Sequence, residues 1–167
     1  MSIHVLISLC IAAITVLHNM NTTEIHRDYT QATRNCSAKC KGNFCNANCT
    51  GTLSDSEAIG FNARAITFGD LSTSECFGPF CQSICDGIMN ICMAKCTGRA
   101  CEAFCRSGGC LTFSDGISSS TSCLGHKCNS NCTGERCMSM CEGTNCNAEC
   151  HAKRCQALCD GASCTTS

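Results

Sequence analysis

A nine-residue period in the positions of cysteine constrains this chain more than any other feature. Cysteine pairs recur as C-x-[A/S]-x-C-x-G-x-x, and the units that carry both cysteines begin at Cys36, Cys45, Cys81, Cys92, Cys101, Cys128, Cys137, Cys146 and Cys155. The stretches between them, such as residues 54–62, keep the period without both cysteines. Fourteen full units therefore run from Cys36 to Ser163, with one two-residue insertion between Cys85 and Cys92. A period of this kind predicts a repeat architecture.

Small side chains occupy alternate positions of every unit. Positions 1, 3 and 5 are Cys, Ala, Ser or Thr in all fourteen units, and position 7 is Gly in twelve, with Ser107 and Ala152 as the exceptions. A period of two is the spacing of one face of a strand, whereas position 3 of a helix would face away from positions 1 and 5. We therefore predict an all-β, partly irregular fold, a disulfide-laddered β-solenoid over residues 36–167. The many helix-favouring residues make stacked short helical turns the alternative.

The units that lack one cysteine indicate how the cysteines pair. Pairing within a unit would join sites ~13 Å apart on a strand, beyond disulfide reach, and would leave Cys76, Cys110, Cys123 and Cys164 without partners. If position 5 instead bonds position 1 of the next unit, cysteines are lost in pairs, as at Ala58 and Ala63. This rule predicts ten bridges: Cys40–Cys45, Cys76–Cys81, Cys85–Cys92, Cys96–Cys101, Cys105–Cys110, Cys123–Cys128, Cys132–Cys137, Cys141–Cys146, Cys150–Cys155 and Cys159–Cys164. Cys36 and Cys49 are left over and can pair with each other.

Each predicted bridge closes a C-x-G-x-x-C turn, in which Gly can supply a positive φ. This turn, followed by a small residue, resembles the tight disulfide-bridged solenoids of insect antifreeze proteins, the midge type above all. The resemblance covers residues 36–164 and is one of architecture, because the Thr rows and the Tyr ladder of those families are absent. The site of the Tyr ladder holds, among others, Phe44, Phe80, Ala100, Lys127, Arg136, Asn145 and Arg154. The resemblance implies a solenoid and, as an alternative function, an ice- or crystal-binding face.

The amino-terminal segment predicts export. Residues 3–17 form an apolar run as long as the hydrophobic region of a signal peptide and shorter than the ~20 residues that span a bilayer. We assign residues 1–18 to a signal peptide, with an uncleaved anchor as the alternative, and residues 19–35 to a polar segment. Cys10 lies in the run, so cleavage leaves 22 of the 23 cysteines, an even number that predicts disulfides in an oxidising compartment. Glycosylation sequons lie at Asn21, Asn35, Asn48 and Asn131.

Position 4 alternates in character between successive units. One set of alternate units carries mostly charged or polar residues, namely Lys39, Glu57, Glu75, Lys95, Asn131 and Glu149, with Phe113 as the exception. The intervening units carry Ile66, Ile84, Phe104, Met140 and Leu158, with Asn48 and Ser122 as the exceptions. If one turn holds two units, the second set forms an apolar face that suits a partner or self-association. The alternatives are nine residues per turn and side chains that merely cover the backbone.

Charge and side-chain chemistry argue against several classes of function. The 12 Lys and Arg residues balance 13 Asp and Glu residues, so no net field points to nucleic acid. No Ser/His/Asp or paired-carboxylate constellation stands out, and we expect neither an enzyme nor a cofactor. The one local cluster of metal-ligand types, Cys146, Cys150, His151 and Cys155, lacks the C-x2-C spacing that zinc sites favour. We therefore expect no metal site, and metal sequestration is a further alternative.

These features together predict a secreted, extracellular, glycosylation-competent repeat protein without a catalytic role. We expect a structural or surface-binding component, with an unknown extracellular partner or self-association, and no membrane contact after signal cleavage.

Overall fold

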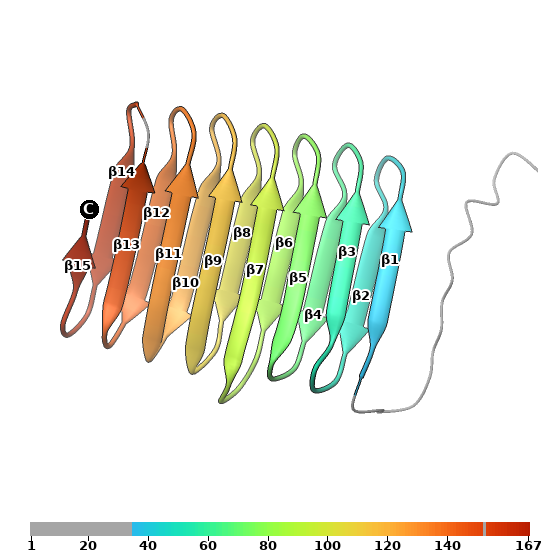
Figure 1. Ribbon diagram of the computed structural model, residues 1–167, viewed down its shortest axis with the longest axis horizontal. Coiled ribbons are helices and arrows are strands. Elements are labelled where there is room, and N and C mark those ends of the chain that lie inside the picture. Colours follow the sequence, from blue (N-terminus) through green and yellow to red (C-terminus); the bar gives the residue numbers. More distant parts are fainter. Residues whose placement is uncertain (1–34, 152) are drawn as a thin grey trace, which may run out of the picture.

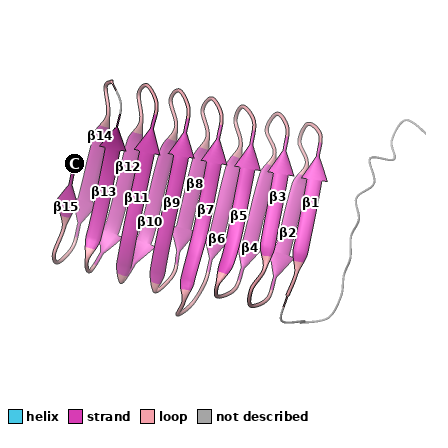
Figure 2. Ribbon diagram, in the orientation of Figure 1, coloured by secondary structure: helices cyan, strands magenta, loops and turns pink. Residues whose placement is uncertain are grey.

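The computed structural model describes residues 35–151 and 153–167, which form strands and turns and contain no helix (Figure 1; Figure 2). The predicted signal peptide, Cys10 and Asn21 lie outside these residues. The strands are β1 (Ser37–Lys41), β2 (Asn46–Thr50), β3 (Asp55–Ile59), β4 (Arg64–Phe68), β5 (Ser72–Phe77), β6 (Gln82–Asp86), β7 (Ile91–Thr97), β8 (Glu102–Arg106), β9 (Gly109–Asp115), β10 (Ser120–Gly125), β11 (Lys127–Thr133), β12 (Met138–Gly143), β13 (Cys146–His151), β14 (Gln156–Asp160) and β15 (Thr165–Thr166).

Successive strands alternate between two parallel sheets. The odd-numbered strands form an eight-stranded sheet and the even-numbered strands a seven-stranded sheet, so each turn holds one strand of each (Figure 1). Lys39 pairs with Glu57, eighteen residues on, and the two inserted residues lengthen one turn so that Ser72 pairs with Cys92. The chain is therefore a β-solenoid of about seven turns with two nine-residue units per turn. This confirms the predicted fold class, and stacked helical turns are wrong.

The interior of the solenoid is filled by small side chains alone. Every buried side chain of the described residues belongs to Ala, Cys, Ser or Thr. Ser74 Oγ donates to the carbonyl of Ala65 at 2.7 Å, and Ser83 Oγ donates to the carbonyl of Ser74 at 2.6 Å. The two residues of each pair are nine apart and lie in opposite sheets, so a side chain at position 3 already reaches the backbone across the interior. A larger residue at position 3 has no room, which explains why that position is always small.

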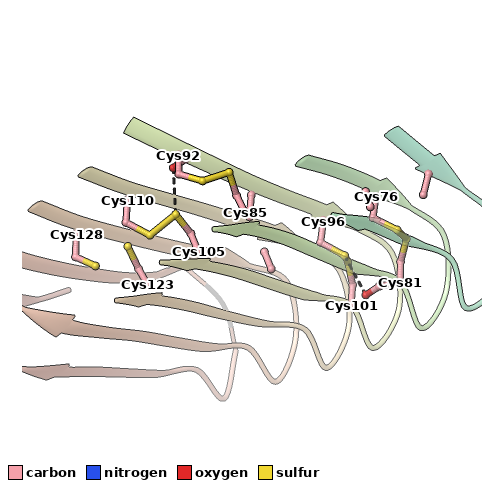
Figure 3. Close-up of a cluster of buried hydrophobic side chains, with 14 of the residues drawn as sticks. Cys76, Cys81, Cys85, Cys92, Cys96, Cys101, Cys105, Cys110, Cys123 and Cys128 are labelled. Atoms are coloured by element: carbon pink, nitrogen blue, oxygen red, sulfur yellow. Dashed lines mark hydrogen bonds between the residues drawn. A yellow bond between two sulfur atoms is a disulfide. The ribbon is translucent and has the colours of Figure 1, made fainter. Parts of the chain in front are cut away.

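Disulfides join consecutive strands along both edges of the solenoid. Position 5 is bonded to position 1 of the next unit at Cys40–Cys45, Cys76–Cys81, Cys85–Cys92, Cys96–Cys101, Cys105–Cys110, Cys132–Cys137, Cys150–Cys155 and Cys159–Cys164. Figure 3 shows the bridges Cys76–Cys81, Cys85–Cys92, Cys96–Cys101 and Cys105–Cys110. The leftover pair is bonded too, as Cys36–Cys49. Each short loop of this kind contributes about 2 kcal/mol in the loop-entropy account of disulfides. The bridges therefore supply much of the stability that a core of large side chains supplies elsewhere.

Two of the predicted bridges are corrected by the structure. Cys123, Cys128, Cys141 and Cys146 are free and buried thiols. Figure 3 shows no bond between the sulfur atoms of Cys123 and Cys128, beside the closed Cys105–Cys110 bridge. The period places the paired cysteines at neighbouring sites, but it does not set their oxidation state, because closing each bond requires an oxidant that accepts two electrons.

The turns use two backbone conformations that L-residues resist. Ten of the twelve glycines at position 7 have a strongly positive φ, as at Gly60 (φ 152°), where an added Cβ would lie 2.0 Å from the carbonyl oxygen of Gly42. Position 9 is left-handed in eleven of the fourteen units, although its residues include Phe44 (φ 57°) and Arg136 (φ 58°). A left-handed non-glycine residue costs about 1–2 kcal/mol. Backbone hydrogen bonds between successive turns offset this cost, because the N–H of position 9 donates to the next turn. The N–H of Phe44, for example, donates to Phe61 O at 2.9 Å.

Replacing glycine at position 7 can destabilise the fold in two ways, through its positive φ and through a clash of the added Cβ. We predict that two Gly→Ala variants separate these two effects. Gly42→Ala and Gly60→Ala impose similar φ values, but only the Cβ at residue 60 meets a backbone carbonyl. Gly42→Ala should lower the free energy of unfolding by about 1–3 kcal/mol, and Gly60→Ala by at least about twice as much. Thermal unfolding followed by circular dichroism measures both. Equal losses for the two variants would show that stacked turns do not restrict this position.

Candidate functional site

The five apolar residues predicted at position 4 lie in one line on the outer face of the seven-stranded sheet. Ile66 is in register with Ile84, and Ile84 with Phe104. Ser122 follows in register as a gap, and Met140 and Leu158 continue the line beyond it. We call these residues the apolar row: Ile66, Ile84, Phe104, Met140 and Leu158. Met140 is 40% and Leu158 51% exposed, and the other three are half-buried.

Polar pairs border the apolar row on both sides. At position 2, Gln82 Nε2 donates to Glu102 Oε2 at 2.9 Å. At position 6, the guanidinium of Arg106 donates through Nε and Nη2 to both carboxylate oxygens of Asp86, at 3.1 and 2.5 Å. An exposed apolar stripe with a polar border is typical of an interaction surface.

The eight-stranded sheet presents charged side chains at the same position. Lys39 Nζ lies 2.7 Å from Glu57 Oε2, and Lys95 Nζ lies 4.0 Å from Glu75 Oε1. The hydrogen bond to Glu57, followed by the attraction of its charge, raises the pKa of Lys39. Phe113 is the apolar exception on this face. The two outer faces therefore differ in chemistry although the same rule builds both.

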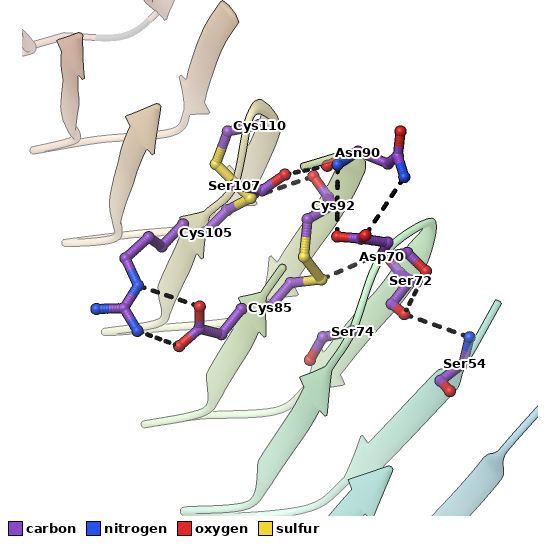
Figure 4. Close-up of a disulfide and its surroundings, with 12 residues drawn as sticks. Ser54, Asp70, Ser72, Ser74, Cys85, Asn90, Cys92, Cys105, Ser107 and Cys110 are labelled. Atoms are coloured by element: carbon purple, nitrogen blue, oxygen red, sulfur yellow. Dashed lines mark hydrogen bonds and ion pairs between the residues drawn. A yellow bond between two sulfur atoms is a disulfide. The ribbon is translucent and has the colours of Figure 1, made fainter. Parts of the chain in front are cut away.

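The inserted loop at residues 87–90 presents two apolar side chains that sequence reasoning missed. Ile88 is 85% and Met89 77% exposed. Asp70 Oδ1 accepts the backbone N–H groups of both, at 2.8 and 3.0 Å. Asp70 Oδ2 accepts Asn90 Nδ2 at 3.3 Å (Figure 4). These donors, led by the N–H of Met89, lower the pKa of Asp70. The interruption of the period was the signal for this loop, but it did not reveal what the loop exposes.

Three aromatic rings gather where the chain leaves β1, β3 and β5. Phe61 makes edge-to-face contacts with Phe44 and Phe80, with ring centroids 5.9 and 5.5 Å apart. All three rings are exposed. Phe44 and Phe80 occupy the site of the midge Tyr ladder, but the third ring comes from position 8 and the rings stand edge to face. The result is a short aromatic cluster and not a flat stack.

The four free thiols form part of a column of sulfur atoms along one edge of the solenoid. Cys141 Sγ donates to Cys146 Sγ at 2.8 Å, and the sulfur atoms of Cys128, Cys141 and Cys146 all lie within 4.8 Å of one another. A hydrogen bond with Cys123, followed by burial, raises the pKa of Cys128. Burial is the leading cause of the raised pKa of Cys141 and of Cys146. These cysteines are therefore protonated at neutral pH, and binding a soft metal ion would require deprotonation against this trend.

The local cluster of metal-ligand types does not assemble into a four-ligand site. Cys150 and Cys155 are bonded to each other. His151 is exposed, with Nε2 3.6 Å from Glu149 Oε2.

The described sequons differ in exposure. Asn35 and Asn48 are exposed, and Asn48 lies in β2 in register with Ile66 of the apolar row. Asn131 is half-buried in β11, and its Nδ2 donates to Glu149 Oε2 at 3.2 Å. A glycan on Asn48 would border the apolar row at its amino-terminal end.

No family model, curated protein or solved structure matches the chain. The likeness to insect antifreeze proteins is therefore one of architecture. None of the described residues forms a helix long and apolar enough to cross a membrane. The function has to be argued from the chemistry of the outer faces and edges.

We predict that the four thiols are hidden in the folded protein and that they make its stability depend on pH. Iodoacetamide should label almost none of them at pH 7, and all four in guanidinium without a reductant, as mass spectrometry can count. The folded chain holds the protons of Cys128, Cys141 and Cys146 more tightly, because the pKa of each is raised. Stability is therefore full below the ordinary thiol pKa and falls as the pH rises above about 8.5.

Replacing all four cysteines by Ser is the matched control, because Ser114 and Ser119 already fill an equivalent pair of sites. This variant should lose the alkaline fall in stability. If guanidinium exposes no thiols in the unsubstituted chain, the two bridges are closed.

Proposed function

We propose that the protein is a secreted, non-catalytic structural element that binds an extended apolar surface through the apolar row. A disulfide-rich solenoid is typical of extracellular structural proteins, because many disulfides form and persist only in an oxidising environment. The observation that carries the proposal is the line of five apolar side chains, held in register along one sheet and bordered by polar pairs.

The rigidity of the sheet supports this role. Neighbouring strands lie ~4.7–4.9 Å apart, and bridges such as Cys85–Cys92 and Cys105–Cys110 fix the strands that carry Ile84 and Phe104. Side chains held in one arrangement lose little conformational freedom when they bind. An apolar row on such a support is suited to a long, regular partner.

The distribution of titratable groups supports a role without catalysis. In the part of the chain that the structure describes, no Asp, Glu, His, Lys or Arg side chain is buried. The buried titratable groups are the free thiols, and the raised pKa of Cys128 and of Cys141 disfavours the nucleophilic thiolate at these two residues. Acid–base chemistry shielded from water is therefore poorly provided for.

The apolar row can be tested by dividing it. Phe104→Thr together with Met140→Thr extends the gap at Ser122 on both sides, and threonine preserves the strands because it is β-branched. We expect binding to a methyl-terminated monolayer, measured with a quartz-crystal microbalance, to weaken about tenfold, at ~25 cal/mol per Å² of apolar area no longer buried.

Phe113→Thr is the matched control, because it removes an apolar side chain from position 4 of the opposite sheet. Its binding should be unchanged. If the control loses as much as the double variant, or if neither variant loses binding, the apolar row is not the binding site.

A second candidate, the binding of ice or another crystal, is favoured by the straight, in-register rows on both sheets. The side chains in the apolar row differ in size and shape from turn to turn, so they do not repeat a lattice spacing. We therefore expect no thermal hysteresis from the purified chain by nanolitre osmometry, with an inert globular protein as the control. A gap between its freezing and melting points would instead make ice binding the leading function.

A further inference from the structure

Both ends of the solenoid are open. Ala38 and Cys40 in the first turn and Ala157 and Cys159 in the last turn are half-buried, whereas their equivalents in the middle turns, such as Ala94, are fully buried. Among the described residues, 35–151 and 153–167, no strand lies beyond β14 in the seven-stranded sheet and none lies before β1 or β2. Unpaired edges of this kind are templates for another strand.

The two ends carry complementary hydrogen-bonding groups. Inside the solenoid, the N–H at position 2 donates to the carbonyl of position 1 in the preceding turn, as from Arg64 to Cys45 and from Gln156 to Cys137. At the amino-terminal end of the described solenoid, no described turn precedes β1 to accept the N–H of Ser37. At its carboxyl-terminal end, no described turn follows β15 to supply a donor to the carbonyl of Cys155. One end thus offers what the other end lacks.

We infer that copies of this chain stack end to end, with β1 of one copy continuing the seven-stranded sheet beyond β14 of another. This inference adds a partner to the structural role proposed above and rests on that role. Successive units alternate between the two sheets, and β15 lies in the eight-stranded sheet. The unit that would follow β15 therefore belongs in the seven-stranded sheet. Strand β1 of the next copy can take that place, because both sheets are built from the same nine-residue repeat. Strand β2 then lies beyond β15 in the other sheet.

The register of this junction is set by the repeat. Ser37 lies beside Gln156, Ala38 beside Ala157, Cys40 beside Cys159 and Lys41 beside Asp160, as equivalent positions do within the molecule. Small inward side chains thus meet small inward side chains, which a chain with larger inward residues would not allow. A one-residue slip would turn every inward side chain outward.

Charge favours the same junction. Lys41 and Asp160 are both exposed, and neither forms an ion pair with another described residue. Asp160 lies in register with Glu142 in its own molecule, so a lysine from the next copy relieves a like-charge pair. The formal net charge of −1 adds little repulsion between copies. Because the contact is head to tail, it does not close and it produces filaments.

The experiment measures self-association of the purified full chain by sedimentation velocity, with electron microscopy of the same samples. We expect the mean mass to rise with concentration and filaments one solenoid wide to form. A mass that stays at one copy at every concentration would overturn the inference, and so would a mass that stops at two copies, because a pair of like ends closes.

Two sets of variants test the geometry of the junction. Ser37→Pro removes the free N–H at the first residue of an edge strand, where proline is tolerated, and it should abolish association, whereas Ser37→Ala should preserve it. Lys41→Asp alone and Asp160→Lys alone should each weaken association about fivefold, in line with an exposed ion pair replaced by repulsion. The two together should restore it. If none of these substitutions changes the strength of self-association, the copies do not associate through this junction.

Circular dichroism of each variant confirms that the fold is intact, so that a lost junction is not confused with a lost solenoid. The assay contains no apolar surface, and the binding assay for the apolar row can be run at concentrations where the chain is a monomer. If the chain does not self-associate but still binds the apolar surface, only the proposed junction is wrong. If it self-associates but does not bind the apolar surface, only the proposed apolar partner is wrong.

Discussion

Two sheets that lie close enough for a serine of one to hydrogen-bond the backbone of the other leave room for no side chain larger than threonine. The contacts from Ser74 to Ala65 and from Ser83 to Ser74 measure this spacing directly. Such an interior buries too little apolar surface to hold a chain together by itself. The disulfides along both edges compensate for it, and their short loops require the glycine turns. Composition, cross-links and turn residues are thus consequences of one narrow interior.

Much of the fold could be predicted because this constraint acts on every unit. Position 3 carries no cysteine and has no turn to form, so its unbroken smallness could only reflect an inward strand face. Pairs such as Ala58 with Ala63 showed that positions 5 and 1 are neighbours, since both members changed together. The number of units per turn was harder to predict, because the inward positions repeat every nine residues whether a turn holds one unit or two. Only the alternation at position 4 carried that information.

Features that depend on backbone hydrogen bonding or on the oxidation state of cysteine could not be predicted from the sequence. Position 9 is left-handed in eleven of the fourteen units, whether it holds Phe44, Asn62 or Arg136. Hydrogen bonds between successive turns impose this conformation, and the residue types at position 9 do not predict it. The carboxylate of Asp70 holds a loop eighteen residues further on, a distance set by the solenoid turn and not by local sequence. The thiols of Cys141 and Cys146 lie side by side as the period requires, but position alone does not decide whether a bond closes.

The narrow interior also determines which residues are free to serve a function and what structure the terminal turns of the solenoid can have. The inward positions have no freedom to vary, so chemical differences accumulate on the outward ones, and the two faces diverge into a charged sheet and an apolar row. The same repetition leaves no natural stopping point, because each turn is a template for the next. The first turn is closed into a ring by Cys36–Cys49 and Cys40–Cys45. This ring holds β1 and β2 in strand geometry although no turn of the described part of the chain precedes them. A covalent ring of this kind prevents fraying without covering the edge. The end that most needs a cap is therefore kept in the conformation that another copy of the chain can pair with.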